Sequence, residues 1–166
     1  IMVRVSRLFP AHRFVIAGAP NFDGTYYRQY IGDYDIPVVF GVTYDLLRHA
    51  DAAIVASGTA TLETALLRVP QVVVYRAHPI SIAIGRLAIK VAYISLVNLI
   101  LNKPAVRELI QKECTADQIA DELDLLLNDS EYRRTLFEHY DLLQEKVGPP
   151  GASDRVAASV IRFLQR

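Results

Sequence analysis

Four short runs of apolar residues constrain the fold of this chain more than any other feature. The runs cover residues 13–18, 36–40, 52–56 and 71–75. Each is apolar almost throughout instead of alternating between apolar and polar residues, which is typical of strands that are buried on both faces. Segments with helical character separate the runs. This alternation predicts an α/β domain, a doubly wound parallel sheet with helices on both faces.

The segments between the runs carry helix signals. We expect helices over residues 25–31, 43–50 and 57–68, and a further helix after Pro79. Thr43 is expected to cap the second of these helices with its side-chain oxygen. The run from Ile80 to Leu101 is long and apolar, but Arg86 and Lys90 interrupt it, and two cations near the middle argue against a membrane-spanning helix. We expect a core helix followed by an extended segment there, with a helix lying on a membrane surface as the alternative.

The last third of the chain has helical patterns only. We expect helices over residues 115–127, 130–146 and 154–164, capped in the first case by Thr115 and in the last by Ser153. Residues 148–151 read Gly-Pro-Pro-Gly and separate the last two helices. The sequence therefore predicts an all-helical C-terminal extension of the sheet domain, with the boundary between residues 114 and 115.

Composition excludes several classes of function. The chain of 166 residues has 18 Lys and Arg against 18 Asp and Glu, so no net charge draws it to nucleic acid. Its single cysteine excludes an internal disulfide and a cysteine-rich metal site. The histidines show no spacing typical of metal ligands, so we expect no metal site.

The segment Ala56-Ser57-Gly58-Thr59-Ala60 carries the clearest chemistry in the sequence. It follows the third predicted strand and begins a helix, and ligands of open α/β sheets bind at that edge. Small residues let a phosphate approach the backbone, while the first turn of the helix supplies unpaired N–H groups and the positive end of its dipole. Ser57 and Thr59 add hydroxyl groups. Neither a Walker sequence nor G-x-G-x-x-G is present, so the pattern indicates an anion site outside those nucleotide-binding classes.

Glu63 lies one helical turn beyond this segment. A capping box needs Glu or Gln three residues after the cap, but Ala60 and Leu62 occupy those positions after Ser57 and Thr59. Two interpretations stay open on physical grounds. Glu63 is a partner of the helix dipole, or it accepts hydrogen bonds from both hydroxyls of a ribose.

Several blocks of the chain resemble lipid-A-disaccharide synthases, glycosyltransferases of the two-domain GT-B architecture. The first block is Ser57-Gly58-Thr59-Ala60-Thr61-Leu62-Glu63, followed by Val69-Pro70 and by residues 72–76. Tyr93-Ile94-Ser95-Leu96-Val97-Asn98 resembles a second family block, which usually has Pro where this chain has Val97. Residues 104–111 and 151–157 are also similar in order and spacing. The related peptidoglycan N-acetylglucosaminyl transferases and UDP-N-acetylglucosamine 2-epimerases differ at the first block.

The resemblance implies a Rossmann-like UDP-sugar-binding domain over residues 1–114, the C-terminal half of a GT-B enzyme. It implies transfer of 2,3-diacylglucosamine from UDP to lipid X, giving lipid A disaccharide 1-phosphate, with no cofactor or metal. Ser57, Gly58 and Thr59 would hold the diphosphate and Glu63 the ribose. Gly41 and Val42, after Phe40, would offer backbone groups to uracil. Arg76 would neutralise phosphate charge, and Asn98 would lie near the donor.

Each of the last two residues also has a structural interpretation. Arg76 could pair with a surface carboxylate, and Asn98 could brace a turn. His78, at the same edge, is expected to have a loop or capping role rather than to act as a base.

The resemblance also implies what lies outside this sequence. We expect the sheet domain to be truncated at its N-terminus, and the acceptor site and general base to belong to a missing N-terminal domain. Residues 115–166 would pack on the sheet domain or cross to a partner domain. The isolated chain would then bind UDP weakly and transfer no sugar. The family implies a cytoplasmic protein, peripheral on the inner face of the inner membrane, and a possible homodimer. A UDP-sugar epimerase of the same fold and a non-catalytic nucleotide-binding or assembly module are the alternatives.

Overall fold

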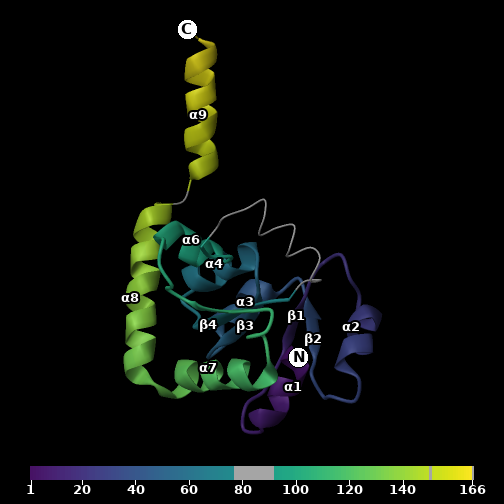
Figure 1. The fold of residues 1–166 in the computed structure, drawn as a ribbon. Helices are drawn as coiled ribbons and strands as arrows, with labels where there is room; N and C mark the ends of the chain where they lie inside the picture. Colours follow the sequence, from purple (N-terminus) through teal and green to yellow (C-terminus); the bar gives the residue numbers. More distant parts are fainter. Residues whose placement is uncertain (77–91, 150, 166) are drawn as a thin grey trace.

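Parallel strands in two small sheets form the centre of the computed structural model, which describes residues 1–76, 92–149 and 151–165 (Figure 1). The strands are β1 (Ile16–Gly18), β2 (Val38–Phe40), β3 (Ala53–Ala56), β4 (Gln71–Tyr75) and β5 (Arg107–Ile110). β1 pairs with β2, and β4 lies between β3 and β5 in the second sheet. All three pairings are parallel, so the carboxyl ends of the strands in each sheet meet at one edge. The expected α/β fold with parallel strands and flanking helices is confirmed, although the strands form two sheets where a single one was expected.

Helices of very different length surround the strands. They are α1 (Met2–Val5), the 3₁₀ turn η1 (Ser6–Leu8), α2 (Gly24–Ile31), α3 (Thr43–Arg48), α4 (Thr59–Leu66), α6 (Leu96–Leu101), α7 (Ala116–Asn128), α8 (Ser130–Val147) and α9 (Ala152–Leu164). α7 packs against β4 and β5, while α4 packs against β3 and β4 and is itself backed by α6 and α8. Among the described helices, none combines the length and apolar character needed to cross a bilayer.

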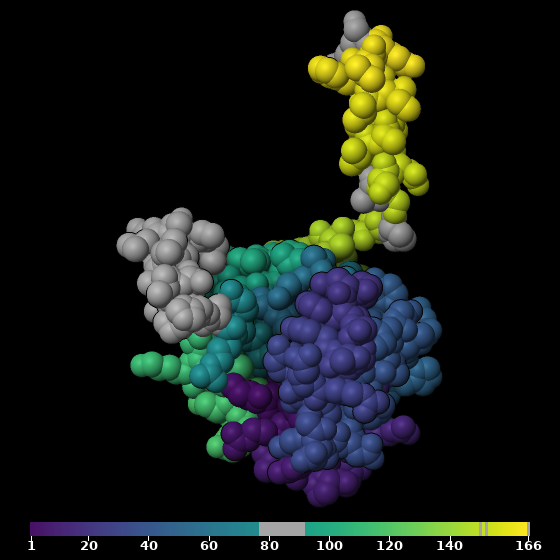
Figure 2. Space-filling view, turned by 90° about the vertical axis from the view of Figure 1, so that its right-hand side faces the viewer, coloured from purple at the N-terminus to yellow at the C-terminus, as the bar shows by residue number. Residues whose placement is uncertain are grey.

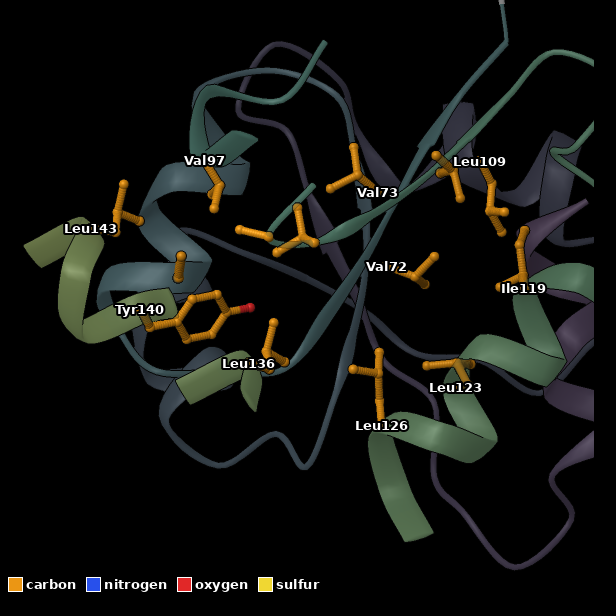
Figure 3. Packing of buried hydrophobic residues seen from close by; sticks show 14 of the residues in the cluster. Val72, Val73, Val97, Leu109, Ile119, Leu123, Leu126, Leu136, Tyr140 and Leu143 are labelled. Carbon is orange, nitrogen blue, oxygen red and sulfur yellow. The ribbon is translucent and has the colours of Figure 1, made fainter. Parts of the chain in front are cut away.

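The core lies around β4, whose residues face helices on both sides. Val72 and Val73 are fully buried, and because neighbouring residues of a strand point to opposite faces, each contributes to a different layer. Figure 3 shows Val72 on the side of β4 where Ile119 and Leu123 of α7 lie, and Val73 on the side of Val97 of α6. Apolar residues spaced along one face of α7 and α8 fill the rest of this cluster. This packing makes the β3–β4–β5 sheet a rigid platform for the loops at its carboxyl edge.

Two caps differ from the prediction. Thr43 is the first residue of α3 and makes no capping bond, because the cap position belongs to Val42. Ser153 likewise lies inside α9, which begins after Gly151. The third predicted cap is confirmed: the Thr115 hydroxyl accepts a hydrogen bond of 3.2 Å from the backbone N–H of Gln118.

The segment from residue 80 to 101 differs from the expectation in its second part. Leu96–Leu101 forms α6, where an extended segment was expected, because Ser95 caps a helix there by accepting a bond from the Asn98 backbone. β5 was not predicted. The helix expected after Pro79, together with Arg86 and Lys90, lies outside the described residues.

α9 is separate from the rest of the described chain. It projects from the end of α8 and stands clear of the body in Figures 1 and 2. Its apolar residues are exposed, including Val156, Val160, Phe163 and Leu164, which follow one another at helical spacing. α7 and α8 pack on the sheet domain, whereas the boundary at residues 114 and 115 stays a prediction.

Glu122 gives a testable pH dependence of stability. This α7 side chain is 7% exposed and accepts a hydrogen bond of 2.6 Å from the Tyr132 hydroxyl of α8. Burial raises the pKa of Glu122 above its ordinary value, and the bond from Tyr132 and the charge of Arg107 only partly oppose this. A raised carboxyl pKa means that the folded state binds the proton more tightly than the unfolded state does. The contribution of Glu122 is therefore complete below its unfolded pKa and is lost as pH rises through its folded pKa.

Glu122→Gln keeps an acceptor for Tyr132 and removes the buried charge. At pH 7 we expect the variant to be more stable than the parent by about 1 kcal/mol or less. This difference should shrink as pH falls towards the ordinary range of a glutamate. Urea unfolding at pH 4.5 and pH 7.5 measures it, and a variant that is less stable than the parent at the higher pH would contradict the assignment.

Candidate functional site

The candidate site is built at the carboxyl edge of the β3–β4–β5 sheet. β3 ends at Ala56, beside Val74 of β4, and the neighbouring Tyr75 lies opposite Ile110 at the end of β5. The turn after β3 leads directly into α4. Arg76 follows β4 and is exposed, so the structure places the predicted diphosphate turn and the predicted phosphate-neutralising arginine after neighbouring strands.

Gly58 gives the turn its shape. Its backbone has φ 153° and ψ −163°, a region that is essentially confined to glycine. A Cβ atom at this position would meet nothing within 4 Å, so backbone conformation and not space requires glycine here. The turn then delivers Thr59 as the first residue of α4.

The first turn of α4 has backbone donors available to a ligand. Gly58 makes no side-chain cap, and the N–H groups of Thr59 and Ala60 have no acceptor among the described residues. Both residues are exposed. The Thr61 hydroxyl donates to the Gly58 carbonyl at 2.8 Å and thereby braces the turn from below. These groups can bind an anion without a metal ion.

The hydroxyl of Ser57 is engaged within the protein. It donates to the carbonyl oxygen of Ile94 at 3.1 Å, and the Ser57 backbone N–H donates to the Val74 carbonyl at 3.1 Å. Ser57 therefore ties the first family-like block to the second. Its predicted contact with a diphosphate stays a prediction, one that requires the hydroxyl proton to change its acceptor.

Glu63 lies one turn along α4 and is half-buried. The nearby Glu63 carboxylate favours the protonated hydroxyl of Tyr44 and raises the pKa of Tyr44 above its ordinary value. Tyr44 belongs to α3, which begins immediately after Gly41 and Val42. The structure thus places the side chain of Tyr44, two residues after the loop predicted for uracil, near the predicted ribose residue.

Asn98 lies beneath the site and is 1% exposed. Its amide nitrogen donates to the Val106 carbonyl and to the Glu108 carboxylate, both at 2.9 Å, and its amide oxygen accepts from the Val106 N–H at 2.9 Å. These bonds brace the connection between α6 and β5. A contact between Asn98 and the sugar donor stays a prediction.

Sequence reasoning missed two residues of this site and could assess others only in part. Tyr44 is relevant because it lies near Glu63, and Glu108 because it binds Ser95. Both relations join residues far apart in the sequence, so no local pattern predicts them. His78 lies outside the described residues. Within those residues, no group of three or more His, Cys, Asp or Glu side chains is placed to hold a metal ion.

Comparison with known proteins identifies the family of this chain. The family model for lipid-A-disaccharide synthetase matches residues 5–151, a range that contains the turn at Ser57–Thr59, Glu63 and the segment around Asn98. The chain belongs to the lipid-A-disaccharide synthase family.

Individual lipid-A-disaccharide synthases agree with this assignment. The protein of Syntrophus aciditrophicus is 35% identical over 173 residues, covering 100% of this chain and 45% of its own length. That of Geobacter sulfurreducens is 37% identical over 130 residues, covering 78% of this chain and 34% of its own. That of Rhodospirillum centenum is 40% identical over 127 residues, covering 74% and 31%. The chain spans less than half the length of these synthases.

Proposed function

We propose that this chain is the donor-binding portion of a UDP-dependent glycosyltransferase. The whole protein would transfer 2,3-diacylglucosamine from UDP to lipid X and release UDP, which would make it a synthase of the disaccharide that the family is named after. The observation that carries the proposal is the turn from Ser57 to Ala60. It offers backbone donors that have no acceptor among the described residues, at the carboxyl edge of a parallel sheet and inside the region that matches the family.

The chemistry of the turn suits the leaving group of this reaction. As the glycosidic bond to UDP breaks, negative charge develops on the diphosphate, and fixed N–H donors stabilise such charge without reorganising. The N–H groups of Thr59 and Ala60 and the Thr59 hydroxyl are suited to this role. Arg76 would add a positive charge from the adjacent strand end. The proposal requires no bound metal ion.

Glu63 and the loop at Gly41 and Val42 would recognise the nucleoside. A carboxylate accepts two hydrogen bonds, one from each hydroxyl of a ribose, which is stronger and more selective than a bond to a neutral acceptor. Tyr44, whose pKa the carboxylate raises, keeps its proton and would be available as a donor that orients Glu63. Backbone groups of Gly41 and Val42 would then meet the uracil ring.

The proposal assigns the acceptor site and general base to the remainder of the full-length protein. A base must reach the hydroxyl of the acceptor in the reactive complex, and the turn contains no group suited to this. We also propose peripheral association of the full-length enzyme with the inner face of the inner membrane, where both lipid substrates reside. Homodimerisation, with α9 crossing to a partner domain, is the assembly that the exposed face of α9 permits.

Replacing Glu63 tests ribose recognition. We expect Glu63→Ala to weaken UDP binding about tenfold, the effect of losing a hydrogen bond to a charged group. Isothermal titration calorimetry with UDP and with 2′-deoxy-UDP measures it. The parent should prefer UDP, and the variant should bind the two nucleotides equally. Glu145→Ala, which removes an exposed carboxylate of α8, is the matched control and should preserve the preference.

Three outcomes separate the proposal from its alternatives. Absence of UDP binding by the parent, with no change in its melting temperature, would favour a non-catalytic assembly module. A full-length protein that epimerises a UDP-sugar and forms no disaccharide would establish an epimerase. Retention of the ribose preference in Glu63→Ala would remove Glu63 from the nucleotide site while leaving UDP binding intact.

A further inference from the structure

The Glu108 carboxylate accepts hydrogen bonds from several donors in residues 94–98. Glu108 lies on β5, and its oxygens accept hydrogen bonds from the backbone N–H of Ile94 at 3.0 Å and of Ser95 at 2.9 Å. They also accept the Ser95 hydroxyl at 2.7 Å and the Asn98 amide at 2.9 Å. Ser95 is fully buried and Asn98 is 1% exposed. One side chain therefore fixes the path of residues 94–98 from within the protein.

This arrangement continues into the turn after β3. The N–H of Ile94 is held by Glu108, while the carbonyl of the same residue accepts the Ser57 hydroxyl. Ile94 thus connects the carboxylate on β5 to the residue that precedes Gly58. Displacing Ile94 would move the acceptor of Ser57. The start of the turn would move with it, and so would the N–H groups of Thr59 and Ala60, which have no acceptor within the described part of the chain.

A glutamine could not reproduce these contacts. One oxygen, Oε1, accepts from both donors of Ser95 and from Asn98, while Oε2 accepts from Ile94. With its own oxygen at the Oε1 position, a glutamine would turn its amide nitrogen, a donor, towards the N–H of Ile94. The size of the side chain would be retained, but the N–H of Ile94 would lose its 3.0 Å acceptor and keep only the longer bond of 3.3 Å to Oε1. The carboxylate is therefore required as an acceptor on both oxygens, and its shape alone is insufficient.

We infer that Glu108 is a positioning residue of the diphosphate turn: through Ile94 it holds Ser57, and hence Gly58 and Thr59, in the conformation that binds the nucleotide. The inference rests on the proposed function for its ligand, UDP, and on the described geometry for its mechanism. Glu108 would not contact the nucleotide; it acts through Ile94, which lies between it and Ser57.

The test combines Glu108→Gln with Ser57→Ala in a double-mutant cycle on the 166-residue chain. Each change breaks the same connection, so we expect each to weaken UDP binding about tenfold and the double variant to bind no more weakly than the weaker single. Amide chemical shifts of Gly58 and Thr59, recorded without ligand, should move in Glu108→Gln. Glu113→Gln is the control, because Glu113 is exposed and pairs with Arg107 at 3.4 Å; it should leave shifts and affinity unchanged.

The outcomes distinguish positioning from stabilisation. If Glu108→Gln lowers the free energy of unfolding but leaves the Gly58 and Thr59 shifts and the UDP affinity as in the parent, the inference is overturned. Additive losses in the double variant overturn it as well. If the parent binds no UDP, the proposed function fails, whereas the ligand-free amide shifts still decide the role of Glu108. Should Glu108→Gln fail to fold, Ser95→Ala removes one donor to Glu108 and should move the same shifts by a smaller amount.

Discussion

Replacing Gly58 by alanine is expected to cost about 2 kcal/mol in total, which corresponds to about a thirtyfold loss of UDP affinity when the cost falls wholly on binding. The backbone of Gly58 lies at φ 153° and ψ −163°, where a Cβ atom is strained whatever space surrounds it. Alanine either keeps this conformation, at a cost to folding, or relaxes and turns the N–H groups of Thr59 and Ala60 away from the ligand. The strain must therefore appear in the free energy of unfolding, in the UDP affinity, or divided between the two.

Measuring both quantities on the same variant checks this expectation. Urea unfolding reports the stability of the free chain, and calorimetry reports the UDP affinity. Gly24→Ala is the matched control: Gly24 is the first residue of α2, has an ordinary φ, and a Cβ atom there meets nothing within 4 Å. We expect the control to change either quantity by less than about 0.5 kcal/mol. A Gly58→Ala variant that matches the parent in both measurements would show that the turn tolerates a side chain.

The sheet and the turn could be predicted from the sequence because both depend on local patterns. β4 was predicted with its observed bounds, Gln71–Tyr75, since an apolar run between Pro70 and Arg76 leaves few alternatives. The turn at Gly58 follows from the small residues between a strand and a helix. Parallel pairing then brings it to the ligand-binding edge without further information.

Features that depend on contacts between distant residues could not be predicted in this way. β5 contains Arg107 and Glu108 at consecutive positions, which conceals a strand from any search for apolar runs. Glu108 is acceptable there because donors from residues 94–98 surround its carboxylate, and this environment exists only in the folded chain. Tyr44 is comparable, because its role comes from Glu63 on another helix.

Leu126→Ala carries the largest expected effect on stability. Leu126 is fully buried on α7, the helix that packs against the central strand β4 (Figure 3). Truncation to alanine removes buried methyl groups and leaves a cavity between helix and sheet that the rigid strand cannot fill. We expect the free energy of unfolding to fall by about 2–5 kcal/mol. This is a large part of the about 5–15 kcal/mol by which domains of this size are stable.

The adjacent residue provides the control for this change. Leu125 belongs to the same helix and is 39% exposed, so Leu125→Ala removes the same atoms and leaves no closed cavity. We expect Leu125→Ala to lower the free energy of unfolding by less than about 1 kcal/mol. The slope of that free energy against denaturant concentration should stay the same in both variants. Equal losses at the two positions would mean that helical preference, and not packing of α7 on β4, determines the stability of this layer. A large loss at Leu126 alone would establish that the C-terminal helices support the sheet whose edge carries the nucleotide turn.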